Sequence, residues 1–431
     1  MNDEKRSGIS PRHWMVVIGS GLLMSMNVLL FLASGMMLPS VADSLDAGLG
    51  QVMVFVSINM VAGAVTLAGA GSYLLGRFGA RALALVGGIF TGLMLFSVGS
   101  VTSLWQLYLL AFASGLLATV AMQMTGAALV NEWFIERRGL MQGLLMGIAG
   151  LGGIAAGFAL PPVMDAGGWR LGFRMVGAVT VTTAVLSGVF LVRTRPGDVG
   201  LHPFGAVANS TTERHIEPGM TTSAALRSPQ LVALMTGLMC FSGIMALQQH
   251  FAPMMADRGL DLAAAGSLLS ILSLVNVATT LLLGNLSDRL GPLVAYCLSG
   301  GLLVAALTTF LLTTGYASQT VAVLLFSIPT ITPPILTPIL LRHTFGGRAF
   351  VSLLGVGTAT MPAGVAIGSP LWGLSKDNAG SYDPALTVAI GLGVACVALV
   401  SFALLTGPRR WQEGPLQSAD GPGRDDLIVP A

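Results

Sequence analysis

Residues 284–291 read Gly-Asn-Leu-Ser-Asp-Arg-Leu-Gly, and they join two long apolar stretches at 262–286 and 293–314. A helix needs about 20 apolar residues to cross the hydrocarbon core of a bilayer, and both stretches are long enough. Residues 287–291 are therefore predicted to form a short polar turn between two membrane-spanning helices. A second turn of this kind, Gly-Arg-Phe-Gly at 76–79, follows an apolar stretch in the first half of the chain.

These turns belong to an internal repeat. Gly79 corresponds to Gly291, and Phe134 corresponds to Phe345, at nearly the same offset of about half the chain. A single short match means little, but two matches at equivalent positions indicate a duplicated unit. We therefore predict two parallel halves of six helices each.

Composition places almost the whole chain in a membrane. Of the 431 residues, 54% are hydrophobic and only 9% are charged, whereas soluble domains use about 25% charged residues. The net charge of +2 gives no support for nucleic-acid binding. The twelve predicted spans are 14–37, 51–75, 82–99, 104–130, 140–163, 173–192, 231–255, 262–286, 293–314, 320–341, 351–374 and 385–406.

The basic residues set the predicted orientation. With the N-terminus in the cytoplasm, 17 of the 21 Lys and Arg residues fall on the cytoplasmic side, as the excess of basic residues in cytoplasmic loops requires. The four outside are Arg170, Arg174, Arg258 and Lys376. Both termini are therefore predicted to be cytoplasmic. The predicted divisions are a cytoplasmic N-terminus at 1–13, a six-helix half at 14–192, a cytoplasmic linker at 193–230, a second half at 231–406 and a cytoplasmic tail at 407–431.

The stretch at 284–291 resembles the cytoplasmic-loop signature of the major facilitator superfamily of transporters. In that signature Gly, Leu, Asp, Arg and Gly recur at fixed spacing, and this chain has all five. The resemblance implies the superfamily's two-half fold and a gating role for Gly284, Asp288, Arg289 and Gly291. Small residues allow close helix approach, and the Asp can cap a neighbouring helix. The first half has Gly76 where the Asp would stand.

Three further stretches resemble the group of monocarboxylate transporters and oxalate/formate antiporters. In that group an Arg in span eight binds the substrate carboxylate, but this chain has Thr280 at that position. Four residues earlier, where some animal members carry an Asp, it has Asn276. The buried Arg–Asp ion pair of that group therefore has no counterpart in this chain. The resembling residues are Trp133, Phe134, Arg137, Arg138, Gly139 and Gly143, then Gly168, Trp169, Arg170, Phe173 and Gly177, and lastly His250 with Pro253.

The predicted spans contain no Asp, Glu or Lys, and no Arg away from a membrane boundary. An ionisable group at the bilayer centre costs roughly 2.5 to 3.5 kcal/mol on insertion scales. We therefore expect the cavity to bind its solute through neutral hydrogen bonds and shape. His250, near the outer end of span seven, is the candidate for proton coupling because imidazole titrates near pH 6.5. The alternative is that His250 bonds a helix end beside Pro253.

Polar residues of the spans that line the central path are the candidates for substrate contact. In the fold implied by the resemblance, these are the first, fourth, seventh and tenth spans. The alternative for each residue is a hydrogen bond between helices, worth about 0.6 to 2 kcal/mol in membranes, and Asn59 in span two is assigned this role. The candidates are Asn27, Thr119, Gln123 and Thr125, joined by Asn276 and Thr280 from span eight.

Spans five and ten have unusual compositions. In span five, glycines at helical spacing from 139 to 157 predict a smooth face for helix packing. Span ten contains Pro329, Pro333, Pro334 and Pro338, and each proline removes a backbone hydrogen bond. A gate that bends at Pro333 and Pro334 is the functional interpretation, and a statically kinked helix is the alternative.

The sequence thus predicts an all-α, multi-pass transporter in the bacterial inner (cell) membrane. By resemblance its solute is a small monocarboxylate-like organic acid, moved by alternating access in secondary active transport (symport) or in facilitative transport. The alternative, favoured by Thr280, is uptake or efflux of a bulkier neutral or weakly acidic metabolite. A membrane-embedded enzyme would need paired carboxylates, a His/Cys metal grouping or a Ser/His/Asp constellation in the spans, and the sequence has none there. The linker and tail are too short for the signalling domain of a transporter-like sensor.

The expected partners are the small-molecule substrate, the lipid bilayer and, through His250, protons. We expect no nucleic acid, no cofactor, no metal and a monomeric chain. Cys240, Cys297 and Cys396 all lie in apolar stretches, so they are interpreted as core residues rather than as a disulfide framework.

Overall fold

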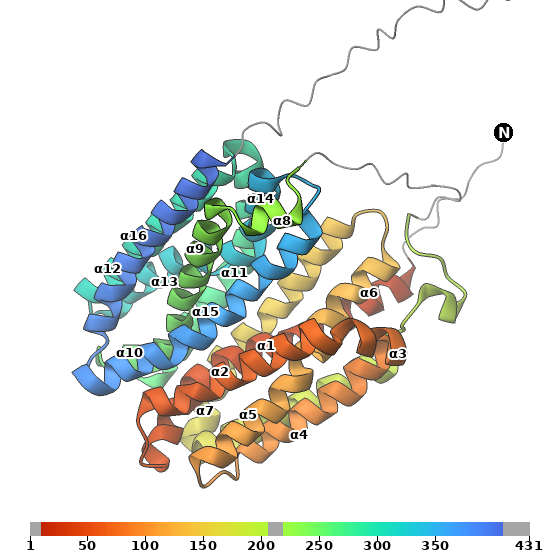
Figure 1. Ribbon diagram of the computed structural model, residues 1–431. Helices are drawn as coiled ribbons and strands as arrows, with labels where there is room; N and C mark the ends of the chain where they lie inside the picture. The colour runs from red at the N-terminus through yellow and green to blue at the C-terminus, as the bar shows by residue number, and fades with distance from the viewer. Residues whose placement is uncertain (1–9, 206–218, 408–431) are drawn as a thin grey trace, which may run out of the picture.

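The computed structural model describes residues 10–205 and 219–407, and its regular secondary structure there is helical (Figure 1). Most of the predicted N-terminus and tail, and the middle of the linker, lie outside the described residues. The first half contains α1 (Pro11–Ser44), α2 (Leu49–Thr66), η1 (Leu67–Gly71), α3 (Ser72–Ala82), η2 (Leu83–Gly87), α4 (Gly88–Val98), α5 (Leu104–Ala118), η3 (Thr119–Met124), α6 (Thr125–Trp133), α7 (Arg138–Leu186) and η4 (Ser187–Leu191).

Two short helices, η5 (Pro196–Val199) and α8 (Thr222–Leu226), belong to the predicted linker. The second half contains α9 (Pro229–Met245), η6 (Ala246–His250), α10 (Phe251–Ala256), α11 (Leu262–Leu290), α12 (Pro292–Leu312), α13 (Tyr316–Thr330), α14 (Thr332–Phe345), α15 (Phe350–Ala379) and α16 (Asp383–Thr406).

Ten continuous helices of the described residues are long and apolar enough to cross a membrane, which confirms the predicted all-α polytopic fold. Two of them, Leu49–Val98 with 50 residues and Gly139–Leu191 with 53, are each long enough for two crossings. The backbone leaves the helical conformation at Gly79 in the first and at Gly167 and Gly168 in the second. Division at these glycines would give two crossings in each helix, as the predicted count of twelve requires, and that count stays a prediction.

The predicted repeat appears in the backbone geometry. Gly79 has φ 76° and ψ 159°, and Gly291 has φ 86° and ψ 156°, a conformation that glycine adopts far more easily than other residues. After spans four and ten, the amide of Phe134 donates to a carbonyl four residues back, and the amide of Gly346 does the same. In the backbone geometry, Phe134 of the first half therefore corresponds to Gly346 of the second half. The sequence comparison had matched Phe134 with Phe345, one residue earlier.

The two ends of the linker lie against these corresponding turns. The amide of Phe204 donates to the carbonyl of Trp133 at 2.9 Å, and the amide of Met220 donates to the carbonyl of Phe345 at 2.9 Å. The ring of His13, near the start of α1, packs edge-on against Trp133 with 5.4 Å between centroids. The start of α1 and the ends of spans four and ten therefore share one end of the bundle, which we call the linker end.

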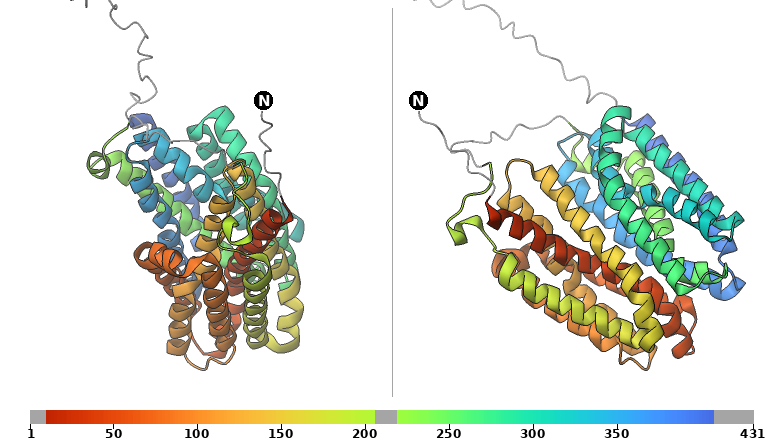
Figure 2. Two further views of the ribbon diagram at one scale, coloured as in Figure 1. Left: turned by 90° about the vertical axis from the view of Figure 1, so that its right-hand side faces the viewer. Right: turned by 180° about the vertical axis from the view of Figure 1, so that it is seen from behind.

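The opposite end, which we call the far end, holds the turn between α1 and α2 and the turn between α15 and α16. The two halves lie side by side in Figures 1 and 2, the first in red to yellow and the second in green to blue. Two helix pairs form most of the contact between them: α2 packs against α15, and α7 packs against α11. A smaller contact joins α1 to η6 and α10.

Glycines make these contacts close. A Cβ atom added to Gly50 would lie 2.6 Å from Leu374 Cγ, and one added to Gly150 would lie 2.6 Å from Val277 Cγ2. Gly157 of α7 meets Gly266 of α11 backbone to backbone. Of the glycines predicted to form a packing face on span five, Gly147, Gly150, Gly153 and Gly157 meet the second half, whereas Gly139 does not.

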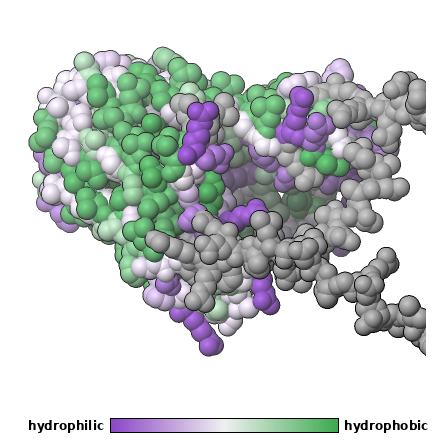
Figure 3. Space-filling view, turned by 90° about the horizontal axis from the view of Figure 1, so that it is seen from above, coloured by the Kyte–Doolittle hydropathy of each residue, from purple (hydrophilic) through white to green (hydrophobic). Residues whose placement is uncertain are grey.

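The same helices separate toward the linker end. A Cβ added to Gly139 of α7 or to Gly355 of α15 would have no neighbouring atom within 4 Å. The view from above in Figure 3 shows the surface hollowed between two masses of the bundle. The halves are therefore closed together at the far end and apart at the linker end.

Candidate functional site

A small pocket with a cavity of about 20 Å³ lies where the two halves come together in the interior. Both halves contribute to it: α1 and α2 from the first and η6 from the second. The lining residues are Asn27, Leu30, Phe31, Ser34, Phe55, Val56, Asn59, Met60 and Gln249. We call this the central pocket.

Three primary amides of the central pocket retain hydrogen-bonding groups for a ligand. Among the described residues, the Asn27 side chain has no hydrogen-bond partner. The amide nitrogen of Asn59 donates to Ser114 Oγ at 2.9 Å and to a carbonyl of α5 at 3.3 Å, which leaves its carbonyl oxygen unused. Gln249 Oε1 accepts from Ser369 Oγ at 2.9 Å, which leaves its NH₂ group unused.

The remaining lining side chains are apolar, apart from Ser34, whose hydroxyl donates to the carbonyl of Leu30 at 2.8 Å. Phe31 and Met60 are partly exposed, whereas Phe55 is buried. None of the nine lining residues is charged. This arrangement suits a small, largely apolar solute with a few hydrogen-bonding groups.

Three predicted candidates occupy the fourth span, where η3 replaces the α-helix with π-helical hydrogen bonding. Thr119 packs its hydroxyl against Gly63 of α2. Thr125 is fully buried and donates to the carbonyl of Val120 at 2.8 Å. Gln123 is exposed, and its predicted contact with the solute stays a prediction.

The candidates of span eight lie beside span ten. Asn276 Oδ1 accepts a hydrogen bond from Thr330 Oγ1 at 3.0 Å, so these side chains join α11 to the end of α13. The hydroxyl of Thr280 donates to the carbonyl of Asn276 at 2.7 Å, within the same helix. The amide nitrogen of Asn276 has no hydrogen-bond partner among the described residues.

Span ten is broken where Thr330 meets Asn276. Between α13 and α14, Ile331 has φ −95° and ψ −3°. Pro333 and Pro334 lie in the first turn of α14, where their missing N–H groups cost no helical hydrogen bond. Interrupted helices line the binding sites of many transporters because the freed backbone groups face a cavity. The predicted bend is therefore a break, and its gating role stays a prediction.

The signature residues lie at the linker end of α11, where residues 284–290 continue the helix and only Gly291 leaves it, so the predicted turn is shorter than expected. Gly291 ends that helix and donates its amide to the carbonyl of Ser287 at 2.9 Å. Asp288 and Arg289 are exposed, and within residues 10–205 and 219–407 neither side chain forms a hydrogen bond or an ion pair. Gly284 lies in α11, one turn before Asp288. The gating roles implied for these residues stay predictions.

At the far end, one carboxylate joins the two halves. Asp377, at the end of α15, accepts hydrogen bonds from the amides of Leu49 at 2.9 Å and Gly50 at 2.8 Å. These amides begin α2, and the positive end of a helix dipole favours a negative charge there. Closer to the interior, Ser57 donates to the carbonyl of Ala366 at 2.5 Å.

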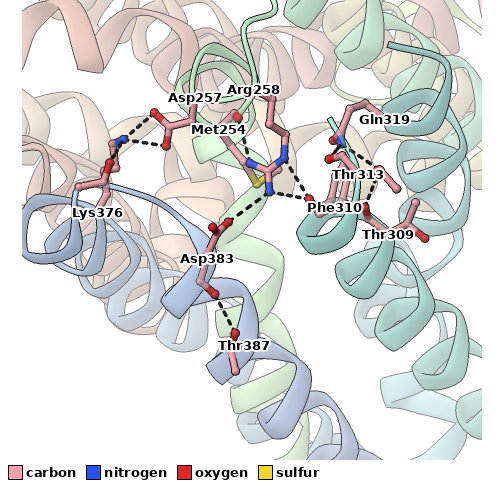
Figure 4. A network of polar contacts seen from close by, with 11 residues as sticks. Met254, Asp257, Arg258, Thr309, Phe310, Thr313, Gln319, Lys376, Asp383 and Thr387 are labelled. Atoms are coloured by element: carbon pink, nitrogen blue, oxygen red, sulfur yellow. Dashed lines mark hydrogen bonds and ion pairs between the residues drawn. The ribbon is translucent and has the colours of Figure 1, made fainter. Parts of the chain in front are cut away.

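Beside Asp377, the charges of the second half form a network within that half (Figure 4). Lys376 Nζ lies 2.5 Å from Asp257 Oδ1, and Arg258 lies 3.7 Å from Asp383. Arg258 also donates through Nε to the carbonyl of Phe310 at 3.0 Å. Burial lowers the pKa of Arg258, and the two nearby carboxylates oppose that shift. The network therefore fixes the turns of the second half at the far end.

His250 is fully buried between this network and the central pocket. Its Nε2 lies 2.9 Å from the carbonyl of Ser369, and its Nδ1 lies 2.9 Å from the hydroxyl of Tyr382. Because a carbonyl can only accept, Nε2 carries the proton and Nδ1 accepts from the tyrosine. Burial raises the pKa of Tyr382, which keeps that hydroxyl protonated. Both ring nitrogens are therefore satisfied within one half.

The family model described as the Major Facilitator Superfamily matches residues 17–339, which is more than half of the chain. The chain belongs to the major facilitator superfamily. Members of this superfamily transport small solutes across membranes, so the protein is a multi-pass membrane transporter, and the family predicted from the signature turn is confirmed.

The relatives of this transporter include monocarboxylate carriers by name. An uncharacterized superfamily transporter of Escherichia coli strain K12, YhjX, is 26% identical over 255 residues, which cover 58% of this chain and 60% of YhjX. Monocarboxylate transporter 11 of Homo sapiens is 25% identical over 279 residues, which cover 64% of this chain and 56% of that protein. The match thus spans less than two thirds of either relative.

Solved structures agree on the fold. Nucleoside transporter NupG superposes with a TM-score of 0.70 at 11% identity, covering 93% of this chain and 100% of NupG. A bacterial homolog of the human lysosomal transporter Spinster, in an inward-facing and unoccupied conformation, superposes with a TM-score of 0.64 at 16% identity, covering 92% of this chain and 96% of that one. At these identities the likeness concerns the fold alone.

Several residues that shape the site gave little signal in the sequence of this transporter. Asp377 follows the last turn of a span, and its partners Leu49 and Gly50 lie more than 300 residues away. Asn59 bonds between helices as predicted, yet it also lines the central pocket. Gln249 stands beside His250 in a run of polar residues, and the sequence did not separate their roles.

We expect His250→Gln to destabilise the transporter while leaving the stimulation of uptake by a pH gradient in place. The glutamine loses at least one of the two buried hydrogen bonds, which costs about 1 to 3 kcal/mol when a buried partner is left unsatisfied. The measurement is thermal unfolding in detergent together with uptake into proteoliposomes. Tyr382→Phe serves as the control, because it removes one of these bonds and leaves the imidazole in place.

The opposite pattern would support the predicted proton role. It would consist of normal unfolding temperature in His250→Gln, with loss of gradient stimulation that Tyr382→Phe does not share.

Proposed function

We propose that this transporter moves a small monocarboxylate-like organic acid by alternating access of its two halves around the central pocket. The observation that carries the proposal is the arrangement of the halves, which are closed at the far end and apart at the linker end. Alternating access requires such a state and its counterpart with the opposite end open. The names of the monocarboxylate relatives support the solute class.

The orientation of the chain supports an inward-open assignment for this state. The excess of basic residues favours a cytoplasmic position for the linker end and for both termini, in a bacterial cell. A solute would then reach the central pocket from the cytoplasm here, and from outside after the far end opens. The proposed contacts are Asn27, Gln123 and Asn276, with Thr119, Thr125 and Thr280 supporting them, and the proposed gates are the break of span ten and the signature turn.

A second candidate solute is a bulkier neutral or weakly acidic metabolite. The neutral lining of the central pocket favours it, as does Thr280 at the position where the resembling group places its carboxylate-binding Arg. The transporter would then either import or export this metabolite, and the solute would carry no charge. The two candidates differ in whether an organic acid competes for the site.

Uptake into proteoliposomes tests the proposal. We expect lactate, oxalate or a simple aromatic acid to accumulate inside vesicles that contain the protein, and an inward proton gradient to increase the accumulation. Protein-free vesicles and vesicles treated with a protonophore are the controls. If no organic acid accumulates or competes, the organic-acid candidate fails and the neutral metabolite becomes the function to test.

A further inference from the structure

We propose that the central pocket binds its solute through one neutral edge on which a hydrogen-bond donor lies beside an acceptor. An undissociated carboxylic acid and a primary carboxamide both have such an edge. This inference rests on the proposed function and specifies the form of its solute. It starts from the three amides, each of which has a hydrogen-bonding group that no described residue uses.

The donor side of the pocket is Gln249. Its side chain is only 1% exposed, and Ser369 fixes the orientation of its amide by donating to Oε1 at 2.9 Å. The backbone of Gln249 is fixed as well, because it touches Gly35 of α1 so closely that a Cβ there would lie 2.8 Å from the Gln249 Cα. The NH₂ group is therefore a rigid donor on the second half.

The acceptor side is Asn59 on the first half. Both hydrogens of its amide nitrogen are used, one by Ser114 Oγ and one by a carbonyl of α5. Rotation of the amide by 180° would place its oxygen against that carbonyl, so the bonds hold the carbonyl oxygen of Asn59 free as an acceptor. Asn27, without a described partner, offers either group.

An ionised carboxylate does not match this set of groups. Both of its oxygens can only accept, so they can bond the amide groups of Gln249 and Asn27, but the carbonyl oxygen of Asn59 is then left without a donor. The lining has no Lys or Arg to balance the charge, and an unpaired charge is very unfavourable in a poorly hydrated site. In the undissociated acid, the O–H donates to Asn59 and the C=O accepts from Gln249. A carboxamide makes the same two bonds with N–H and C=O.

The walls suit a planar apolar body attached to that edge. Phe31 and Phe55 both line the pocket, and Met60 adds an adaptable side chain. The cavity itself is only about 20 Å³ in this state, roughly the space of one water molecule, so a ring-sized solute enters only if the partly exposed Phe31 and Met60 side chains move aside. We therefore use one-ring probes: benzamide, benzoic acid and benzenesulfonic acid.

For an acid, this form of recognition couples transport to protons without a titrating group in the protein. The carboxylate takes up one proton in the water on the side of higher proton concentration, crosses as the neutral acid, and releases that proton into the water on the other side. One proton and one carboxylate thus move together, and no charge crosses the membrane. His250 keeps its two hydrogen bonds throughout.

Binding to the purified full-length protein in nanodiscs tests the inference, with thermal stabilisation as the readout at pH 5.5 and pH 7.5. We expect benzamide to bind equally at both values. Benzoic acid should bind about 100-fold more weakly at pH 7.5, because its undissociated fraction falls about tenfold per pH unit above its own pKa near 4. Benzenesulfonate, ionised at both values, should not bind. Benzoate binding that is independent of pH, or binding of benzenesulfonate, overturns the inference.

Two variants locate the binding in the central pocket. Gln249→Glu exchanges the donor for an acceptor of the same size, and we expect it to weaken benzamide binding about tenfold. Gln106→Glu is the matched control, because that half-buried glutamine lies at the far end and uses only its oxygen, to Thr102. Asn27→Leu gives a second test, since Asn27 has no described hydrogen bond to lose. Benzamide binding unchanged in both pocket variants overturns the inference.

The outcomes also separate this inference from the proposed function. Uptake of lactate by a protein that binds neither benzamide nor benzoic acid overturns the inference and leaves the organic-acid function standing. Benzamide binding that Gln249→Glu weakens, in a protein that takes up no organic acid, supports the inference and removes that function.

Discussion

Replacing Gly157 with leucine is expected to reduce uptake by this transporter about 10- to 100-fold. Gly157 lies on α7 at the contact with α11 of the other half. A Cβ at this position would lie 3.0 Å from the amide nitrogen of Ser270 and would also meet the Ser270 hydroxyl and the carbonyl of Gly266. Two of these three atoms are main-chain atoms of a helix, so they cannot rotate away as a side chain would.

The size of the effect follows from where the strain acts. Overpacking a close contact costs about 1 to 3 kcal/mol, and each 1.4 kcal/mol changes an equilibrium about tenfold. The cost applies to the state with the far end closed, because in the proposed cycle the opening of that end moves α7 away from α11. The variant therefore populates the state with the far end open and depopulates the state with the far end closed. A carrier that cannot close one end completes few transport cycles.

Gly139→Leu is the matched control for Gly157→Leu. It adds the same side chain to the same helix, at a position where a Cβ has no neighbour within 4 Å. We expect its uptake to stay within about twofold of the unmodified protein, as surface substitutions cost about 0.5 kcal/mol or less. If Gly157→Leu and the unmodified protein show equal uptake, closure of the far end is not a step of the transport cycle. If both variants lose uptake equally, the cause is the leucine on helix α7 and not the contact between α7 and α11.

The membrane fold could be predicted from the sequence because the bilayer imposes a length and an apolar character on each span. The two loop glycines, Gly79 and Gly291, reported the repeat correctly, since their shared backbone conformation strongly favours glycine. The glycines of span five also predicted a packing face. These signals are local, and each follows from a constraint that acts on a few neighbouring residues.

The site was harder to predict because it depends on which side chains meet across the two halves. Asn27 was selected and lines the central pocket, whereas Thr125 was selected and turned its hydroxyl into its own helix. Asn59 satisfies its amide nitrogen in the protein and still offers its oxygen to the pocket. A polar residue in an apolar span shows only that a partner exists, and the sequence cannot say whether the partner is a helix or a solute.

Asp377→Asn is expected to loosen the far end, with amide hydrogen exchange at the start of α2 becoming about tenfold faster. The carboxylate of Asp377 accepts from the amides of Leu49 and Gly50, and hydrogen bonds to a charged group contribute about 1.5 to 3 kcal/mol, against about 0.5 to 1.5 for neutral ones. Asparagine keeps one acceptor oxygen but loses the charge that favours the helix N-terminus. A difference of about 1.4 kcal/mol corresponds to the tenfold change.

Hydrogen exchange followed by mass spectrometry on peptides covering residues 45–56 measures this effect directly, because the two amides that Asp377 binds lie in that segment. Asp383→Asn is the control: its side chain is 62% exposed, and its ion partner Arg258 belongs to the same half, so its loss should leave exchange at 45–56 unchanged. Unchanged exchange in Asp377→Asn would show that helix packing of Gly50 against Leu374 holds the far end closed without the charge. Faster exchange in Asp377→Asn alone would assign to one carboxylate a measurable share of the free energy that keeps the halves together at the far end.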